Sequence, residues 1–340
     1  MKKLLLFIVI LLTTVYAKAT ILNVDNNPNR PSGYYSSLPL AINAASAGDT
    51  LYVYPSNVSY GTITVTKKLH FFGSGYSSTT GAESQLHYVY LDTTISPASN
   101  PSGSTFQGFK ISRISCQKPN IVNIVLSGNY FSSYINLSSN CSGWLITNNY
   151  ISYQIYLNNN SSIIISNNVF NDGYGISTSN SPSVLISHNL FMAWAYFNGV
   201  YNATVSDNIF ICSTTNPVPS SMAHNNFINN ISWRSALNPY TIPPESNSGS
   251  GNISNQDPKF ETANASGNFD FTKDYHLKVT SPGINNASDG TNIGIYGGSN
   301  PFVWGGSFSI PKITESLITN PVINQSTPIN VNVKANKAKL

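Results

Sequence analysis

The sequence Ile146-Thr-Asn-Asn149-Tyr-Ile151 belongs to a repeat that decides the fold of this chain. Five more segments share its order: an apolar, a small and a variable residue, then Asn, a variable residue and an apolar residue. They are Leu126-Ser-Gly-Asn129-Tyr-Phe131, Ile165-Ser-Asn-Asn168-Val-Phe170, Ile186-Ser-His-Asn189-Leu-Phe191, Val205-Ser-Asp-Asn208-Ile-Phe210 and Met222-Ala-His-Asn225-Asn-Phe227. The Asn residues are 20, 19, 21, 19 and 17 positions apart, so the chain is built from stacked units.

A repeat of this length fits either leucine-rich repeats or a β-solenoid. Apolar residues alternate with period two, as in Ser162-Ile163-Ile164-Ile165, and no helical period appears, which favours the solenoid. Each repeat then forms one coil of short strands, with coils about 4.8 Å apart. We expect the recurring Asn in a turn, because Asn tolerates the left-handed conformation, and its amide to form a ladder with its equivalents. The apolar residue two positions later should point inward.

The solenoid needs caps, because its end coils expose unpaired backbone and apolar side chains. Leu38 to Ala47 reads as a short amphipathic helix that covers the first coil. Residues 257–310 read as a terminal lid. The segments expected to form strands outside the repeat are Leu51 to Tyr54, Ile63 to Val65, Leu69 to Phe72 and Ile329 to Val333, and Phe106-Gln-Gly-Phe109-Lys-Ile111 is a degenerate early copy of the repeat.

The N-terminus predicts an exported protein. Lys2 and Lys3 precede an apolar run from Leu4 to Val15, and Ala17-Lys18-Ala19 fits a signal-peptidase site, so the mature chain should begin near Thr20. An uncleaved membrane anchor is the alternative, and no later segment is apolar enough to span a membrane. The predicted organisation is therefore a signal peptide at 1–19, a β-helix with caps at 20–300 (regular coils about 50–235), and a tail with a short strand at 301–340.

The chain holds three cysteines, Cys116, Cys141 and Cys212. Export permits a disulfide, for which Cys116 and Cys141 are the closest pair. The alternative is three buried free thiols that act as small hydrophobes. No cysteine spacing typical of a zinc site occurs.

Charged residues are scarce. They make up 9% of the chain, against roughly 25% in an ordinary soluble domain, and the net charge of +4 comes mostly from the two ends. We therefore expect no nucleic-acid partner. No phosphate-binding or dinucleotide motif is present, so we expect no cofactor and no resident metal.

These features resemble the right-handed parallel β-helix, pectate-lyase-like superfamily, in a form similar to secreted proteins of the Bacteroidetes. The resemblance covers roughly residues 35–300. It rests on the Asn repeat together with Ala41-Ile-Asn-Ala-Ala45 through Gly48-Asp-Thr-Leu-Tyr-Val-Tyr-Pro55, Asp257-Pro-Lys-Phe260, Tyr275-His-Leu277, Ser281-Pro-Gly283 and Ile293-Gly-Ile-Tyr-Gly-Gly298. The resemblance implies a protein that handles polysaccharides, as a lyase, a hydrolase, an esterase or a protein without activity.

The regular coils offer little for catalysis. Between Pro119 and Trp233 the sequence has no Lys, Arg or Glu, and Asp172 and Asp207 are its only carboxylates. The related lyases use a basic residue and often Ca²⁺, and hydrolysis needs two carboxyls about 5–9.5 Å apart. Neither arrangement can be built from this segment alone.

One candidate catalytic group remains. The residues just before each repeat Asn include His188, Asp207 and His224, which would form a column on neighbouring coils if the register holds. Such a column could polarise a histidine as a general base or hold a metal ion. The alternative is a solvated row of turn residues.

Two groups of residues are candidates for binding sugar. Lys110 and Arg113, with Lys118 nearby, could contact an acidic chain. Tyr130 and Tyr150 each follow a repeat Asn and present rings for stacking on sugars. Further aromatic residues lie close by in the sequence: Tyr153, Tyr156, Tyr174, Trp194, Tyr196 and Tyr201. The alternative is that these basic side chains are simply solvated and that the aromatic rings cover coils or loops.

The sequence thus predicts an all-β parallel β-helix that is secreted or held at the cell surface. We expect it to bind extracellular polysaccharide, or to have a structural or adhesive role, without catalysis. The alternative is a polysaccharide lyase or glycoside hydrolase of the same superfamily.

Overall fold

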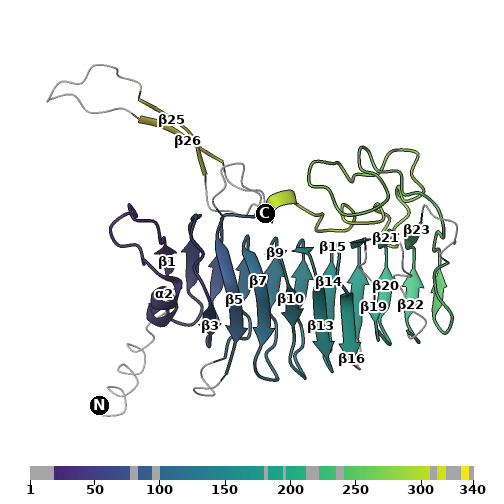
Figure 1. Ribbon diagram of the computed structural model, residues 1–340, viewed down its shortest axis with the longest axis horizontal. Helices are drawn as coiled ribbons and strands as arrows, with labels where there is room; N and C mark the ends of the chain where they lie inside the picture. The colour runs from purple at the N-terminus through teal and green to yellow at the C-terminus, as the bar shows by residue number, and fades with distance from the viewer. Residues whose placement is uncertain are drawn as a thin grey trace, which may run out of the picture.

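The computed structural model describes residues 19–76, 83–93, 100–179, 183–193, 197–211, 222–234 and 241–306, and the backbone of 312–318 and 331–336. It confirms an all-β parallel solenoid, in which successive coils stack along one long axis (Figure 1). Three faces of the coil carry strands. No helix in the described part of the chain is long and apolar enough to cross a membrane.

The first face is an eleven-stranded parallel sheet that runs the length of the solenoid. Each strand pairs with its equivalents on the coils before and after it. In spatial order the strands are β1 (Ile21–Val24), β2 (Thr50–Val53), β4 (His70–Phe72), β6 (Thr105–Gln107), β8 (Val125–Ser127), β11 (Leu145–Thr147), β14 (Ile163–Ser166), β17 (Val184–Ser187), β20 (Thr204–Ser206), β22 (Asn226–Ile228) and β24 (Ser248–Ser250).

The second and third faces diverge from two longer strands, β5 (Gln85–Leu91) and β7 (Lys110–Cys116), which span both. The second face contains β9 (Tyr130–Phe131), β12 (Tyr150–Ile151), β15 (Val169–Asn171), β18 (Leu190–Met192), β21 (Ile209–Ile211) and β23 (Ile231–Trp233). The third face contains β3 (Ile63–Val65), β10 (Tyr134–Asn136), β13 (Gln154–Asn158), β16 (Gly175–Ser179) and β19 (Phe197–Asn198).

A ladder of buried asparagines joins the first face to the second. From one coil to the next, the amide Nδ2 donates to the following Oδ1 at 2.9–3.1 Å. The rungs are Asn129, Asn149, Asn168, Asn189, Asn208, Asn230 and Asn252. Because each amide also donates to a backbone carbonyl of the preceding coil, the ladder satisfies polar groups that the corner would otherwise bury unpaired.

Two expectations about this ladder are wrong. The left-handed residue is not the ladder Asn but the residue before it, such as His188 with φ 54° and Asp207 with φ 60°. Asn225 is also not the sixth rung, because Val205 pairs with Phe227 and thereby places Asn230 after Asn208. Asn225 lies at another corner, where its amide donates to Asn247 at 2.9 Å.

The interior of the coils is apolar and closely stacked. The inward position two residues after the ladder Asn is filled by Phe170, Phe191 and Phe210, whose rings stack with centroids 4.6 and 4.9 Å apart. This confirms the predicted inward stack. At the N-terminal end, α2 (Leu38–Ala44) buries Leu38, Ala41 and Ile42 against the first strands. It ends three residues earlier than expected.

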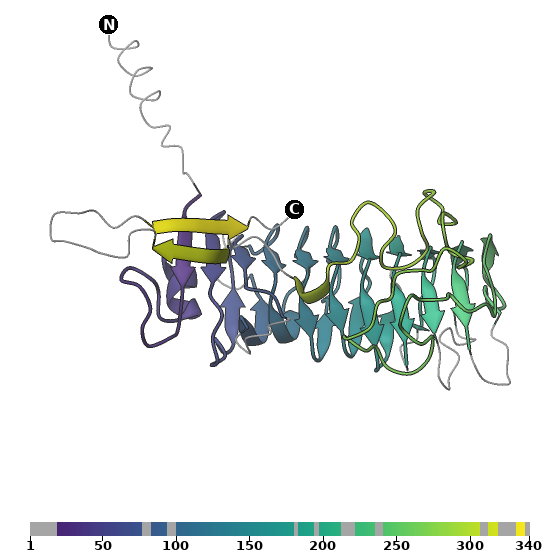
Figure 2. The same cartoon turned by 90° about the horizontal axis from the view of Figure 1, so that it is seen from above.

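The lid, residues 257–306, is present but covers a different surface from the one predicted. It lies along the second face rather than over the last coil (Figures 1 and 2). Outward side chains next to the ladder, such as Leu190 and Ile209, pack against lid residues that include Ile293 and Ile295. The lid ends in the 3₁₀ helix η1 (Trp304–Gly306).

Beyond the lid, β25 (Lys312–Ile318) and β26 (Val331–Asn336) form an antiparallel pair, so the strand expected at 329–333 is found slightly later. Cys116 and Cys141 are buried free thiols with their sulfurs 3.3 Å apart. Cys212 and residues 1–18 lie outside the described residues.

Candidate functional site

The column of residues before the ladder asparagines holds the lid. Asn148 donates to the carbonyl of Asn300, and Asn167 donates to the carbonyls of Ile295 and Gly297. Both Asn side chains are buried, and both residues are left-handed. Their side-chain amides therefore point out of the coil and donate hydrogen bonds to backbone carbonyls of the lid.

Asp207 is the most firmly held member of this column. Its Oδ1 accepts from the backbone N–H of Ser288 and its Oδ2 accepts from the Ser288 hydroxyl, both at 2.6 Å. The residue is 2% exposed, and its carbonyl also accepts from the N–H of Gly294. The carboxylate is thus committed to anchoring the lid.

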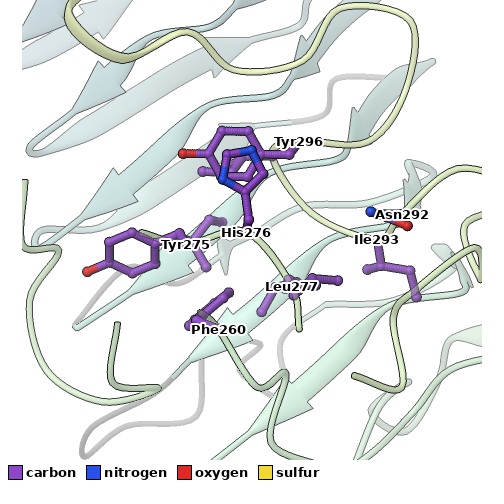
Figure 3. A pocket seen from close by; sticks show the side chains of 10 residues that line it. Phe260, Tyr275, His276, Leu277, Asn292, Ile293 and Tyr296 are labelled. Atoms are coloured by element: carbon purple, nitrogen blue, oxygen red, sulfur yellow. The ribbon is translucent and has the colours of Figure 1, made fainter. Parts of the chain in front are cut away.

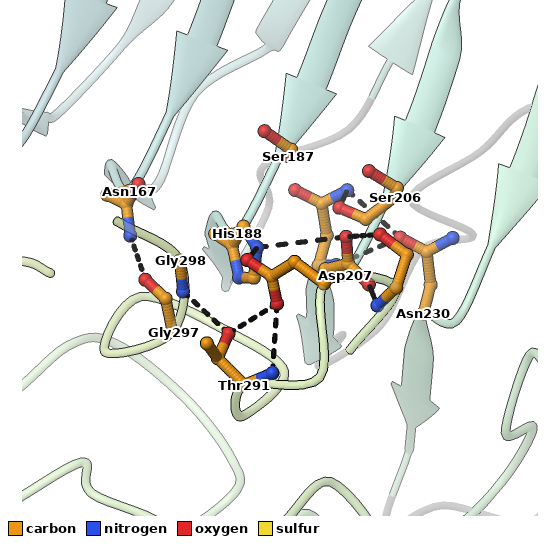
Figure 4. A network of polar contacts seen from close by, with 12 residues as sticks. Asn167, Ser187, His188, Ser206, Asp207, Asn230, Thr291, Gly297 and Gly298 are labelled. Atoms are coloured by element: carbon orange, nitrogen blue, oxygen red, sulfur yellow. Dashed lines mark hydrogen bonds and ion pairs between the residues drawn. The ribbon is translucent and has the colours of Figure 1, made fainter. Parts of the chain in front are cut away.

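His188 lies between two carboxylates. Its Nε2 is 3.7 Å from Asp207 Oδ2 (Figure 4). The same Nε2 is 3.4 Å from Oδ2 of Asp289 in the lid. Gly297 and Gly298 pack on the ring so closely that a Cβ on either would lie within 2.8 or 3.1 Å of it. The imidazole is therefore enclosed by the lid rather than solvated, which excludes the solvated-row alternative for His188 and Asp207.

Asp289 is the one carboxylate of this group that faces solvent, with 42% of its side chain exposed. Partial burial works against ionisation, but hydrogen bonds from Thr291 and the nearby His188 hold the pKa of Asp289 below its usual value. Sequence reasoning missed this residue because it lies outside the repeat, in a segment that only folding brings beside His188.

His224 does not continue the column. The register places Asn229 after Asp207, whereas His224 is exposed at the corner before β22, where its backbone N–H donates to the carbonyl of Ser246. The sequence prediction was wrong because it aligned Asn225 with the ladder. No group of three or more His, Cys, Asp or Glu residues suited to a metal occurs in the described part of the chain.

An open groove of about 510 Å³ lies between the lid and the first face. Its floor carries a row of small hydroxyl side chains, Ser166, Ser187 and Ser206, on consecutive strands. His188 and Asp289 line its wall. Hydroxyls in this spacing can form hydrogen bonds with a polar chain. Two carboxylates also line the groove, but Ser288 donates to both oxygens of Asp207, which leaves Asp289 as the more accessible acid.

Tyr130 and Tyr150 stack on each other, with centroids 4.9 Å apart and an interplanar angle of 21°. Tyr150 is 4% exposed because Phe269 and Phe271 of the lid cover it. Lys110 lies over the Tyr130 ring at 5.6 Å and forms an ion pair with Glu83 at 3.2 Å. The predicted site around Tyr150 is therefore closed by the lid.

Arg113 forms a different site, on the third face, with tyrosines that the sequence analysis did not place together. The strand register sets Tyr88, Arg113 and Tyr134 side by side on three consecutive coils. Tyr90 lies two residues after Tyr88 on β5, and Tyr156 lies in the same row as Tyr90 but on β13, one coil beyond Tyr134. We call these five residues the tyrosine–arginine strip.

The strip is organised around the guanidinium group. Its carbon lies 4.2 Å from the Tyr88 ring centroid and 5.1 Å from that of Tyr134. Arg113 donates to the hydroxyls of Tyr134 and, at 3.0 Å, Tyr90. The bond to Tyr134 raises the pKa of Arg113, so the group is a fixed cation.

The other residues considered for binding are spread out. Tyr156 is 36% exposed and meets the Tyr134 ring edge to face at 5.7 Å. Tyr174 is 44% exposed and contacts Tyr153 beside the strip. Lys118 lies past the end of β7, and Trp194 and Tyr196 lie outside the described residues.

No protein-family model matches the chain, and no curated protein matches it.

Proposed function

We propose that the protein is an exported β-helix protein that binds an acidic polysaccharide along its tyrosine–arginine strip and does not cleave it. The observation that carries this proposal is the strip itself, where a cation is held among exposed or half-exposed aromatic rings on a face that the lid leaves open. Residues 1–19 have the composition of a signal peptide, which supports export.

The strip matches the chemistry of a sugar chain. Coils are about 4.8 Å apart, so Tyr88 and Tyr134 lie about 10 Å apart along the axis with Arg113 between them. Ring faces stack on the C–H surfaces of sugars, while a guanidinium can bind a carboxylate through two hydrogen bonds. A uronate-containing chain parallel to the solenoid axis would meet both features.

The guanidinium at the centre of the strip is suited to recognition rather than to proton abstraction. β-Elimination needs a free base beside the sugar C5, and among the described residues no carboxylate forms an ion pair with Arg113. Arg113 is bonded to two phenols and remains protonated. Its role is therefore to recognise charge.

The second candidate function is glycan hydrolysis in the groove, favoured by the placement of His188 between Asp207 and Asp289. It is the weaker candidate because both oxygens of Asp207 accept from Ser288. Membership of the pectate-lyase-like superfamily is part of the same proposal, supported by the parallel coil and the motifs quoted above.

The test combines affinity electrophoresis in gels that contain polygalacturonate, alginate or neutral glucan with assays of cleavage. We expect retardation by at least one uronate polymer, and its loss in Arg113→Gln and Tyr134→Ala. A matched control is Tyr201→Ala, since Tyr201 is 36% exposed away from the strip. Retardation that survives in Arg113→Gln would reject the strip, and turnover seen as 235 nm absorbance or reducing ends would reject the non-catalytic role.

A further inference from the structure

The lid carries a second hollow that the strip does not use. It opens on the outer side of the lid with a volume of about 290 Å³, and we call it the lid cleft. Two loops form it, one contributing residues 269–276 and the other residues 296–304. Ligand pockets typically begin near 300 Å³, so the cleft has room for a ligand about the size of one sugar residue.

Two stacked aromatic pairs line the cleft. Phe271 and Trp304 stack with centroids 4.3 Å apart, although Phe271 is 40% and Trp304 is 37% exposed. His276 and Tyr296 stack at 3.7 Å with an angle of 11°, as their overlapping rings show in Figure 3. The cleft thus presents two partly exposed rings, and the faces of aromatic rings are suited to stacking on the C–H surfaces of a sugar.

The His276–Tyr296 pair also separates the cleft from the inside of the lid. A smaller hollow of about 50 Å³ lies on its other side, lined by apolar residues such as Phe260 and Ile293 (Figure 3). That space can hold a few waters but is too small for a sugar residue. A ligand therefore has to occupy the outer cleft.

The polar rim of the cleft carries charges of both signs. Lys273 supplies a positive charge, and Asp274 accepts from His276 Nδ1 at 2.6 Å. The hydrogen bonds from His276 hold the pKa of Asp274 below its usual value, although partial burial opposes this. Donors and acceptors of both kinds around aromatic rings fit the hydroxyls and C–H faces of an uncharged pyranose better than they fit an anion.

We infer that the lid cleft is a binding site for a single neutral hexose residue, stacked on the Phe271–Trp304 pair and hydrogen-bonded to the rim. It is separate from the tyrosine–arginine strip, which lies on the third face, and does not depend on it. A protein with both sites would contact two different sugars, so it could join two glycan chains.

The test is saturation-transfer difference NMR with methyl glucoside, methyl galactoside and methyl mannoside on the full chain. We expect transfer to ring C–H protons of at least one hexoside, and a loss of affinity of about tenfold in Trp304→Ala and in Phe271→Ala. Val279→Ala, which changes an 87% exposed lid residue outside the cleft, should bind as the native chain does.

Two outcomes would overturn the inference: no transfer to any of the three hexosides, or transfer that is equal in both variants and the native chain. Circular dichroism and the thermal midpoint of each variant establish that it is folded. The two proposals are distinguished on the native chain, because excess hexoside should leave retardation by uronate polymers unchanged.

Discussion

Removing one rung of the asparagine ladder, by Asn168→Ala, should strongly destabilise the solenoid. Asn168 Oδ1 accepts from both the backbone N–H and the amide of Asn149, at 2.9 and 3.0 Å, and its own amide donates to Asn189. Asn149 is fully buried, so water cannot replace the lost acceptor. Each orphaned buried group costs about 1–3 kcal/mol, and two donors lose their acceptor, so we expect about 2–6 kcal/mol of lost unfolding free energy.

Guanidinium chloride unfolding, followed by far-UV circular dichroism, measures this loss. The matched control is Asn198→Ala, because Asn198 is exposed on β19 and should change the unfolding free energy by less than about 0.5 kcal/mol. Equal midpoints for Asn168→Ala and Asn198→Ala, with unchanged slopes, would show that the ladder does not stabilise the coils as argued.

Three further predictions concern the lid and the thiols. Asp207→Ala should release the lid, seen as faster hydrogen exchange in the lid peptides with the coil peptides unchanged; unchanged lid exchange would contradict the anchoring role. The pKa of Asp289 is lowered in the folded chain, so the ionised carboxylate stabilises the folded lid above about pH 3.8, and this stabilisation is lost as the pH falls below that value. Below that pH, hydrogen exchange in the lid should become faster in the native chain but not in Asp289→Asn. Cys116 and Cys141 should close a disulfide on mild oxidation, because their sulfurs are in contact, and the 25-residue separation predicts about 3.5 kcal/mol of stabilisation. After unfolding, the oxidised protein should show one thiol to Ellman's reagent, that of Cys212, and three reactive thiols would contradict the prediction.

The periodicity of the sequence was sufficient for the fold because each coil repeats the same inward positions. Asn149, Asn168 and Asn189 occupy equivalent corners, so their spacing carries the register directly. The predicted register was wrong only after Asn208, where the next coil is longer. There Asn225 matches the local pattern while Asn230 takes the rung.

The sites were harder to predict because they depend on contacts between distant segments. No local sequence pattern indicates that Asp289 lies beside His188 or that Phe271 covers Tyr150. The lid has no sequence repeat from which its position on the coils could be deduced. The residue after the ladder Asn did indicate which face is covered. This residue is apolar on two coils, where it is Val169 or Leu190, and an apolar outward position indicates a covered rather than a solvated face.

The tyrosine–arginine strip becomes apparent only from the strand register in the structure. Tyr88 and Tyr90 are two residues apart on β5, so their side chains lie on the same side of the strand. Arg113 pairs with Tyr88 on the next coil. Coil lengths differ there from those of the regular repeat, so the alignment was not apparent from spacing alone.

The most direct test of the proposed function is titration calorimetry of the native chain and Arg113→Gln with one uronate oligosaccharide, with 235 nm absorbance followed in the same sample. The account predicts saturable binding by the native chain, at least tenfold weaker binding by Arg113→Gln, and no change in absorbance. Equal binding by both proteins, or a steady rise in absorbance, would contradict it.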